Sequence, residues 1–126
     1  MEILTVELEG LPPSVNGMYV RKRRNVYKDR KARDWQDQAV RKLKEEWEGK
    51  PALNCALELR IEYTTSDHRR WDIDNRVKAL QDTLETADVI TDDRLIEKLQ
   101  VKRKYGKTTA TRITLVSYGD ENETER

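Results

Sequence analysis

Apolar positions in this chain fall into short alternating runs and two longer runs with helical spacing. Ile3, Leu4, Val6 and Leu8 approximate a period of two with glutamates between them, which predicts a strand ending at Gly10. The same signals and β-branched side chains predict three further strands, at 53–63, 95–105 and 110–118. The first five residues of the 95–105 run would fit a helical turn equally well. Residues 106–109 predict a hairpin turn between the last two strands.

Two segments carry the three- and four-residue spacing of amphipathic helices. The first runs from Asp29, a suitable N-cap, to Trp47, and Gly49-Lys50-Pro51 ends it. The second has an apolar stripe from Val77 to Ala87. Between the first strand and the first helix, residues 15–28 show no sustained period, so we predict a mobile loop that could clasp a ligand.

These elements predict one compact α/β domain of the α+β type, with a small mixed sheet and two main helices. The length of 126 residues suits a single core. We place the domain at 1–119 and expect 120–126 to be a disordered acidic tail. The chain has no apolar run of about 20 residues and no signal peptide. Its one cysteine, Cys55, has no intrachain partner and is expected to be buried, so we expect a soluble cytoplasmic protein.

Charge is strongly segregated, although the formal net charge is only +1. Residues 18–33 carry eight basic side chains against one acid, a local balance of +7, and 102–112 carry five basic side chains and no acid. Between them, 66–93 holds eight acids against four bases, a balance of −4. Two basic segments around an acidic centre favour a polyanionic ligand. The alternative is that each run only solvates an exposed loop or hairpin.

The acidic centre contains the most informative stretch, Trp71 to Lys78, which is followed by Asp92-Asp93. If the second helix begins near Ile73, four side chains share one polar strip: Asp74, Lys78, Gln81 and Glu85. Asp72 could point to the same place, and the later acidic pair would reach it only if the intervening loop folds back. The simpler alternative is helix capping by Asp72, an ordinary Asp74–Lys78 pair, and turn roles for the later acids.

Such carboxylates suit Mg²⁺, with Mn²⁺ a plausible substitute, and the lack of clustered histidine or cysteine argues against zinc. On a phosphodiester, an ion of this kind can activate water and neutralise the charge that develops on the phosphoryl oxygens. Lys78 would add a fixed positive charge at the phosphate. The stretch therefore predicts metal-dependent phosphodiester cleavage.

The run Asp72-Ile73-Asp74-Asn75, with Lys78 after it and Asp92-Asp93 after the helix, resembles the RusA family of Holliday junction resolvases. The early run Leu11-Pro12-Pro13-Ser14-Val15-Asn16 is also similar to that family's N-terminal signature, a Pro-Ser-x-Asn element after the first strand. The two motifs stand in the right order, and the resemblance covers nearly the whole chain.

This resemblance implies a RusA-like homodimer that binds four-way DNA junctions and, with Mg²⁺, makes symmetric paired nicks in DNA recombination and repair. It assigns metal binding to Asp72, Asp74 and Asp93, and catalysis to these acids together with Lys78; Asp92 is left open. Trp71 stands where a basic residue is expected in at least some relatives. Its ring could be partly buried against the helix or could stack on a base.

A two-fold dimer suits a four-way junction, because the junction has approximate two-fold symmetry. The predicted DNA contacts come from the segments around the acids: Asn16, Arg21, Arg23, Arg24, Arg69, Arg70, Lys102, Lys104 and Lys107. Two alternatives remain open, a non-catalytic protein that binds branched DNA or other nucleic acid, and a nuclease of broader flap or branch specificity.

Overall fold

The computed structural model describes residues 1–14, 19–22, 25–28, 30–69 and 71–119, and for 19–22 and 25–28 it describes the backbone alone. Its strands and helices in chain order are β1 (Glu2–Glu9), β2 (Tyr19–Lys22), β3 (Asn25–Lys28), α1 (Arg30–Trp47), β4 (Leu57–Thr65), α2 (Val77–Thr86), β5 (Ile96–Tyr105) and β6 (Ala110–Ser117). Two 3₁₀ turns, η2 (Ile73–Arg76) and η3 (Asp93–Leu95), flank α2.

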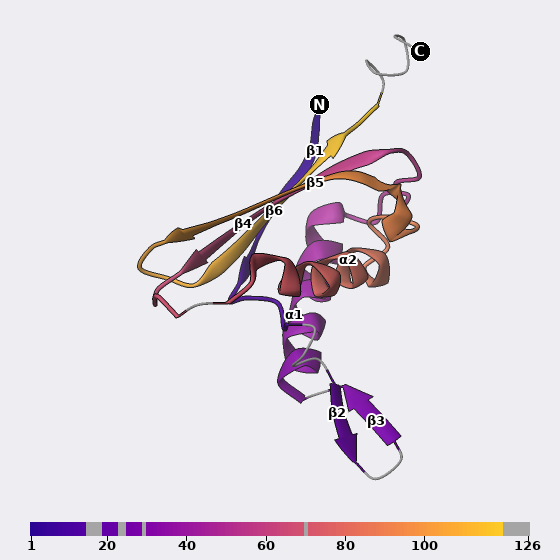
Figure 1. Ribbon diagram of the computed structural model, residues 1–126. Coiled ribbons are helices and arrows are strands. Elements are labelled where there is room, and N and C mark those ends of the chain that lie inside the picture. The colour runs from indigo at the N-terminus through magenta and orange to yellow at the C-terminus, as the bar shows by residue number, and fades with distance from the viewer. Residues whose placement is uncertain (15–18, 23–24, 29, 70, 120–126) are drawn as a thin grey trace.

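The main sheet has four strands in the order β1-β6-β4-β5. β4 pairs antiparallel with β6 and parallel with β5, and β1 pairs antiparallel with β6. A parallel pair needs a long crossover, and here the crossover contains α2. Both helices lie on one side of the sheet (Figure 1). The predicted α+β class, with a mixed sheet and two main helices, is confirmed.

The predicted hairpin between the last two strands is wrong. β5 and β6 do not pair with each other, because β4 lies between them. Residues 106–109 cross the end of β4, where Gly106 N–H donates to the Thr65 carbonyl at 3.0 Å and Ser66 N–H donates to Thr109 Oγ1 at 3.3 Å. Two strand spacings amount to about 9.6 Å, which four residues can span. The chain does reverse direction at 106–109, but the strand that pairs with both β5 and β6 is β4, which is far away in sequence.

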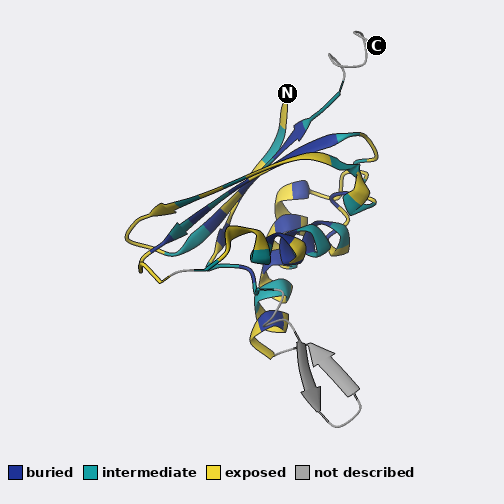
Figure 2. Ribbon diagram, viewed as in Figure 1, coloured by how far each residue is buried: buried dark blue, intermediate teal, exposed yellow. Residues whose placement is uncertain are grey.

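The core fills the space between the sheet and the helices (Figure 2). Alternate residues of β4, from Leu57 to Tyr63, are buried on the helix-covered face, whereas Arg60 lies exposed on the other, open face. The two helices and the neighbouring strand β6 contribute further fully buried side chains: Leu43, Leu80, Leu84, Ile113 and Leu115. Burying an aliphatic or aromatic side chain contributes roughly 1.5–3 kcal/mol. The packing of helices on this face is therefore the main source of stability.

The loop predicted for residues 15–28 is also wrong in part. β2 and β3 form an antiparallel pair, with Val20 opposite Tyr27 and Arg21 opposite Val26. Valine and tyrosine favour extended backbone. This preference was missed because the dense run of basic residues hides any regular apolar period. Residues 15–18, 23–24 and 29 lie outside the described residues.

The first helix ends as predicted, at Trp47, where Glu48 and Gly49 take the left-handed φ values of 55° and 70°. Its predicted N-cap, Asp29, lies outside the described residues, as does the predicted tail at 120–126. Cys55 is exposed rather than buried, because the strand expected from Leu53 begins only at Leu57. None of the helices in the described ranges is long and apolar enough to cross a membrane.

Candidate active site

The stretch from Asp72 to Lys78 enters α2 through a 3₁₀ turn. Asp72 precedes η2 in extended conformation and its side chain makes no capping hydrogen bond. The α-helix itself begins only at Val77, although the sequence suggested a start near Ile73. Asp72 and Asp74 are both exposed on this entry segment.

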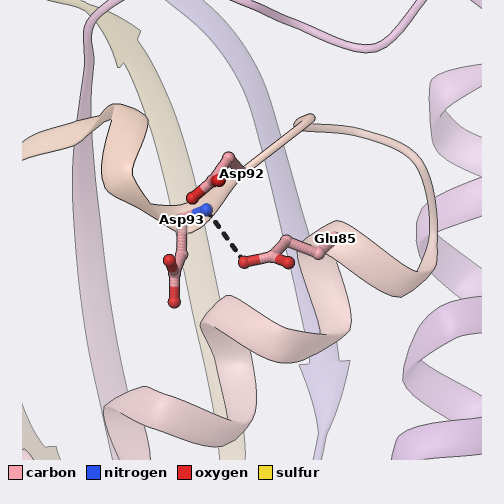
Figure 3. Close-up of side chains that lie close together, drawn as sticks. All are labelled: Glu85, Asp92 and Asp93. Atoms are coloured by element: carbon pink, nitrogen blue, oxygen red, sulfur yellow. Dashed lines mark hydrogen bonds between the residues drawn. The ribbon is translucent and has the colours of Figure 1, made fainter.

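The later acidic pair does fold back onto α2. Asp93 N–H donates a hydrogen bond of 2.8 Å to Glu85 Oε1 on the last turns of the helix (Figure 3). Asp92 caps η3 by accepting from the Arg94 N–H at 2.8 Å. The closure that the sequence suggested between the helix and the second acidic pair is therefore present.

Three half-buried carboxylates meet at this closure. Glu85, Asp92 and Asp93 each offer an oxygen, and these oxygens lie within 4.8 Å of one another (Figure 3). A set of hard oxygen donors at this spacing fits a divalent cation such as Mg²⁺ or Mn²⁺. Asp92 also pairs with Arg94, with Nη2 2.9 Å from Oδ2. The hydrogen bonds from Arg94 lower the pKa of Asp92 and keep it ionised.

Lys78 joins this acidic cluster from the first turns of α2. Its Nζ lies 3.1 Å from Asp82 Oδ1 and 3.3 Å from Asp93 Oδ2. Hydrogen bonds to Asp82 and then Asp93 raise the pKa of Lys78, so its ammonium group stays charged. The sequence predicted Asp74 as the neighbour of Lys78, but Asp74 forms no salt bridge within the described part of the chain.

The structure thus brings together part of the predicted site. Asp93 and Lys78 are in contact, whereas Asp72 and Asp74 lie outside the carboxylate cluster of the single chain described. Glu85 also belongs to the cluster, and its position on the polar strip of the helix was the only sign of this in the sequence. The metal-binding and catalytic roles of these side chains remain predictions.

Trp71 is partly buried, and it packs against both strand β4 and the entry to α2. Its ring meets that of Tyr63 on β4 edge-on, with centroids 5.3 Å apart. Two guanidinium groups also contact the Trp71 ring, Arg76 at 4.7 Å and Arg103 at 4.5 Å from the centroid. Arg76 Nη1 donates to the Pro12 carbonyl at 2.6 Å, which joins the two sequence motifs in space.

The predicted DNA contacts are spread over several surfaces. Arg69 lies near Trp71 and pairs with Asp67, whereas Lys102 and Lys104 alternate onto the open face of the sheet. Lys107 is exposed in the crossing segment. Five of the predicted residues cannot be placed by their side chains, because they lie outside the described residues or are described by backbone alone: Asn16, Arg21, Arg23, Arg24 and Arg70.

The chain matches the family described as endodeoxyribonuclease RusA over residues 9–116. It is also 32% identical, over 108 residues, to the crossover junction endodeoxyribonuclease RusA of Aquifex aeolicus (strain VF5), covering 85% of each chain. The chain belongs to the RusA family. The matched region runs from the end of β1 to the end of β6, so it includes both motifs and the carboxylate cluster.

Two arginines near the RusA motif were not among the predicted site residues. Arg76 lies within the motif itself, between Asp74 and Lys78. Arg103 lies opposite Tyr63 in the parallel pairing of β4 and β5, and this register turns it to the helix-covered face. Arg76 could have been singled out from the sequence because it stands inside the motif. Arg103 was one of five bases in the 102–112 run, and only the strand register distinguishes it from the others.

Proposed function

We propose that this RusA-family protein is a divalent-metal-dependent endodeoxyribonuclease that resolves four-way DNA junctions by symmetric paired nicks, in DNA recombination and repair. The observation that carries the proposal is the contact of Lys78 with Asp93 inside a cluster of three carboxylates. Family membership supports nuclease chemistry, and the cluster supplies the ligand type that Mg²⁺ or Mn²⁺ prefers.

The proposed donors are Asp93 with Glu85 and Asp92, together with the predicted ligands Asp72 and Asp74 from the entry to α2. A bound divalent ion supplies Lewis-acid stabilisation of phosphoryl oxygens and lowers the pKa of its water. Glu85 fixes the backbone of Asp93 through its 2.8 Å hydrogen bond and so orients that carboxylate.

Lys78 has two roles in this proposal. Without DNA its ammonium group offsets the repulsion between the clustered acids, through contacts of 3.1 and 3.3 Å to Asp82 and Asp93. With DNA present it offers the same positive charge to the phosphate at the cleavage position. A lysine serves both purposes because its four-carbon stem lets the ammonium group move between neighbouring oxygens.

The predicted basic residues around the acids would contact the backbone of branched DNA, largely without regard to sequence, and most strongly where no carboxylate already engages them. A homodimer would present two equivalent sites to the two-fold symmetric junction.

One observation favours a second candidate, a non-catalytic protein that binds branched DNA. Asp92 is neutralised by Arg94, and Asp93 by Lys78, as in ordinary surface ion pairs. In that case the acids would serve only structure, and added metal would change neither binding nor the DNA. A nuclease of broader flap or branch preference is separated by competition between junction, flap and linear duplex.

Cleavage of a synthetic four-way junction with Mg²⁺ tests the proposal. Wild-type protein is expected to nick, and Asp93→Asn to lower the rate at least about 100-fold, since even residues that only orient a metal ligand cost 10–100-fold. Asp82→Asn is the matched control, because it also removes a carboxylate from Lys78 but lies outside the cluster. Absence of nicking by wild type, or equal rates for the two variants, would reject the proposal.

Metal binding can also be measured without DNA. Like charges in the cluster repel one another, so millimolar Mg²⁺ or Mn²⁺ is expected to raise the melting temperature of the wild type. Asp93→Asn should reduce this shift, whereas Asp82→Asn should keep it. An unchanged melting temperature in wild type across a metal titration would count against the cluster as the metal site.

A further inference from the structure

A cleft of about 430 Å³ lies beside Trp71, apart from the carboxylate cluster. Its lining includes Asp67, Arg69, Trp71 and Arg76, so the segment that leads into α2 forms part of its wall. Polar and charged side chains therefore surround a space large enough for a phosphate group and its sugar.

Arg76 is the most unusual charge in this cleft. It is partly buried, and burial lowers the pKa of its guanidinium group. The group donates to the Pro12 carbonyl at 2.6 Å, but its Nε has no hydrogen-bond partner. Within the described part of the chain it forms no salt bridge with a carboxylate. A partly desolvated cation without a counter-charge is costly unless a ligand supplies that charge.

Arg103 repeats this pattern beside the same Trp71 ring. Its Nη2 donates to the Arg69 carbonyl at 2.6 Å, and its Nε is buried without a partner. Its guanidinium lies 4.5 Å from the Trp71 ring centroid and 5.1 Å from that of Tyr105. Aromatic faces hold a cation in place but do not neutralise it.

The local balance of charge is therefore positive. Among the described residues that line the cleft or contact the Trp71 ring, three carry guanidinium groups, Arg69, Arg76 and Arg103, and one, Asp67, carries a carboxylate. Asp67 is already engaged by Arg69, through a backbone N–H at 3.0 Å and a side-chain contact at 3.4 Å. The hydrogen bond from the Arg69 backbone is the main reason that the pKa of Asp67 is lowered.

A purely structural role explains part of this arrangement. The two arginines tie the carbonyls of Pro12 and Arg69 to the Trp71 ring, and this would fix the segment before Asp72. A neutral donor would make the same hydrogen bonds at a lower desolvation cost, so this role does not account for the charge. Planar guanidinium groups beside an open cleft suit the oxygens of a phosphate.

We infer that the cleft beside Trp71 binds a backbone phosphate of the DNA substrate. Arg76 and Arg69 donate to its oxygens. Trp71 is a positioning residue: its ring holds the guanidinium group of Arg76 at the cleft and that of Arg103 beside it. The inference rests on the proposed function, since it takes the anion to be a phosphodiester of DNA. In this inference Trp71 acts by holding the two arginines that contact its ring, and not by stacking on a base.

Binding of a four-way junction in EDTA, measured over a range of NaCl concentrations, tests the inference without any need for cleavage. Arg76→Gln is expected to weaken binding about tenfold and to lower the slope of log affinity against log salt by about one, as loss of one phosphate contact does. Arg112→Gln is the matched control, because it removes the same charge from the open face of the sheet. It should change affinity less than about threefold and leave the slope unchanged.

Further variants separate charge from structure. Arg76→Lys keeps the charge, so its salt slope should match wild type while affinity falls severalfold through loss of the planar fork. Trp71→Leu should lower both affinity and slope, and Trp71→Phe should restore much of each because it retains an aromatic face. Melting curves identify any variant that is unfolded, and the Arg76 pair keeps the test valid if Trp71→Leu does not fold.

Three results would overturn the inference. One is a folded Arg76→Gln with wild-type affinity and slope; another is an equal loss for Arg112→Gln. The third is a melting-temperature increase with inorganic phosphate that Arg76→Gln abolishes, together with no junction binding by wild type, which would make the cleft a site for free phosphate. If wild type binds the junction but does not nick it when Mg²⁺ is restored, the proposed nuclease function fails while the inference about the cleft stands.

Discussion

Strand β5 presents basic side chains to both faces of the sheet, but among the described residues they are paired with carboxylates only on the open face. On the open face, Lys104 Nζ lies 3.1 Å from a carboxylate oxygen of Glu62. On the covered face, Arg103 contacts the Trp71 ring and the Arg69 carbonyl, and it forms no salt bridge within the described ranges. A basic run in the sequence therefore mixes charges that are already paired with charges that are available to a ligand.

The difference follows from strand alternation. Neighbouring residues of a strand point to opposite faces, and the pairing with β4 decides which acids each can meet. Glu58 and Glu62 alternate onto the open face, whereas their neighbour Tyr63 lies beneath Trp71. The acids of β4 can therefore reach only the open-face bases.

The largest expected effect on stability comes from truncating Tyr63, the buried side chain on which Trp71 packs. Tyr63 has no exposed surface and packs against Trp71. Tyr63→Ala should lower the free energy of unfolding by about 3–5 kcal/mol through lost contacts and a cavity. Urea denaturation measures this loss, and a variant as stable as wild type would mean that the covered side is not packed as described.

The next effect compares the two faces directly. Arg103→Gln should weaken junction binding about tenfold, which is about 1.4 kcal/mol, because no carboxylate among the described residues pairs with its charge. Lys104→Gln should weaken binding less than about threefold, because Glu62 already engages the lysine. Equal losses in a titration at one salt concentration would remove the distinction between the faces.

A smaller effect is expected on the stability of the fold at low pH, and it comes from the carboxylates of the open face. A hydrogen bond from Arg60 lowers the pKa of Glu58, and one from Lys104 lowers that of Glu62. A lowered pKa stabilises the fold above the unfolded value, near pH 4.3, and this stabilisation is lost as pH falls through the folded value. Glu58→Gln should therefore cost about 1 kcal/mol or less at pH 7 and flatten the loss of stability below about pH 4.

That result is checked by thermal melting from pH 7 to pH 3. Arg76→Gln provides the comparison from the covered face, since no carboxylate in the described part of the chain pairs with Arg76. Its stability should follow the same pH dependence as wild type. A steeper acid loss in Glu58→Gln than in wild type would contradict the assigned pairing with Arg60.

The smallest expected effect is that of Tyr63→Phe. The Tyr63 hydroxyl is buried without a hydrogen-bond partner, and burial raises the pKa of the phenol. Removing an unsatisfied polar atom while keeping the ring should change the free energy of unfolding by about 0.5 kcal/mol or less, or raise it slightly. A loss of more than about 1 kcal/mol in urea denaturation would reveal a hydrogen bond at that hydroxyl.

Part of the candidate site could be predicted because it is local. The helical spacing placed Lys78 and Glu85 on one strip of α2, and Asp93 does return to that strip. The sequence erred over Asp74, because a 3₁₀ turn precedes the α-helix and shifts the side chains that share a face with Lys78. A change in helix type of only four residues is invisible to a periodic pattern.

By itself the sequence determined the order of most elements, the fold class and the two motifs that mark a RusA-family chain, since these depend on neighbouring residues. Only the tertiary structure decided that β4 separates β5 from β6, and that Arg76 and Arg103 converge on Trp71. Strand order is a competition among distant segments for the same backbone partners, and it sets the face on which each side chain lies. The face on which Arg103 lies follows from that register, which no local run of charges contains.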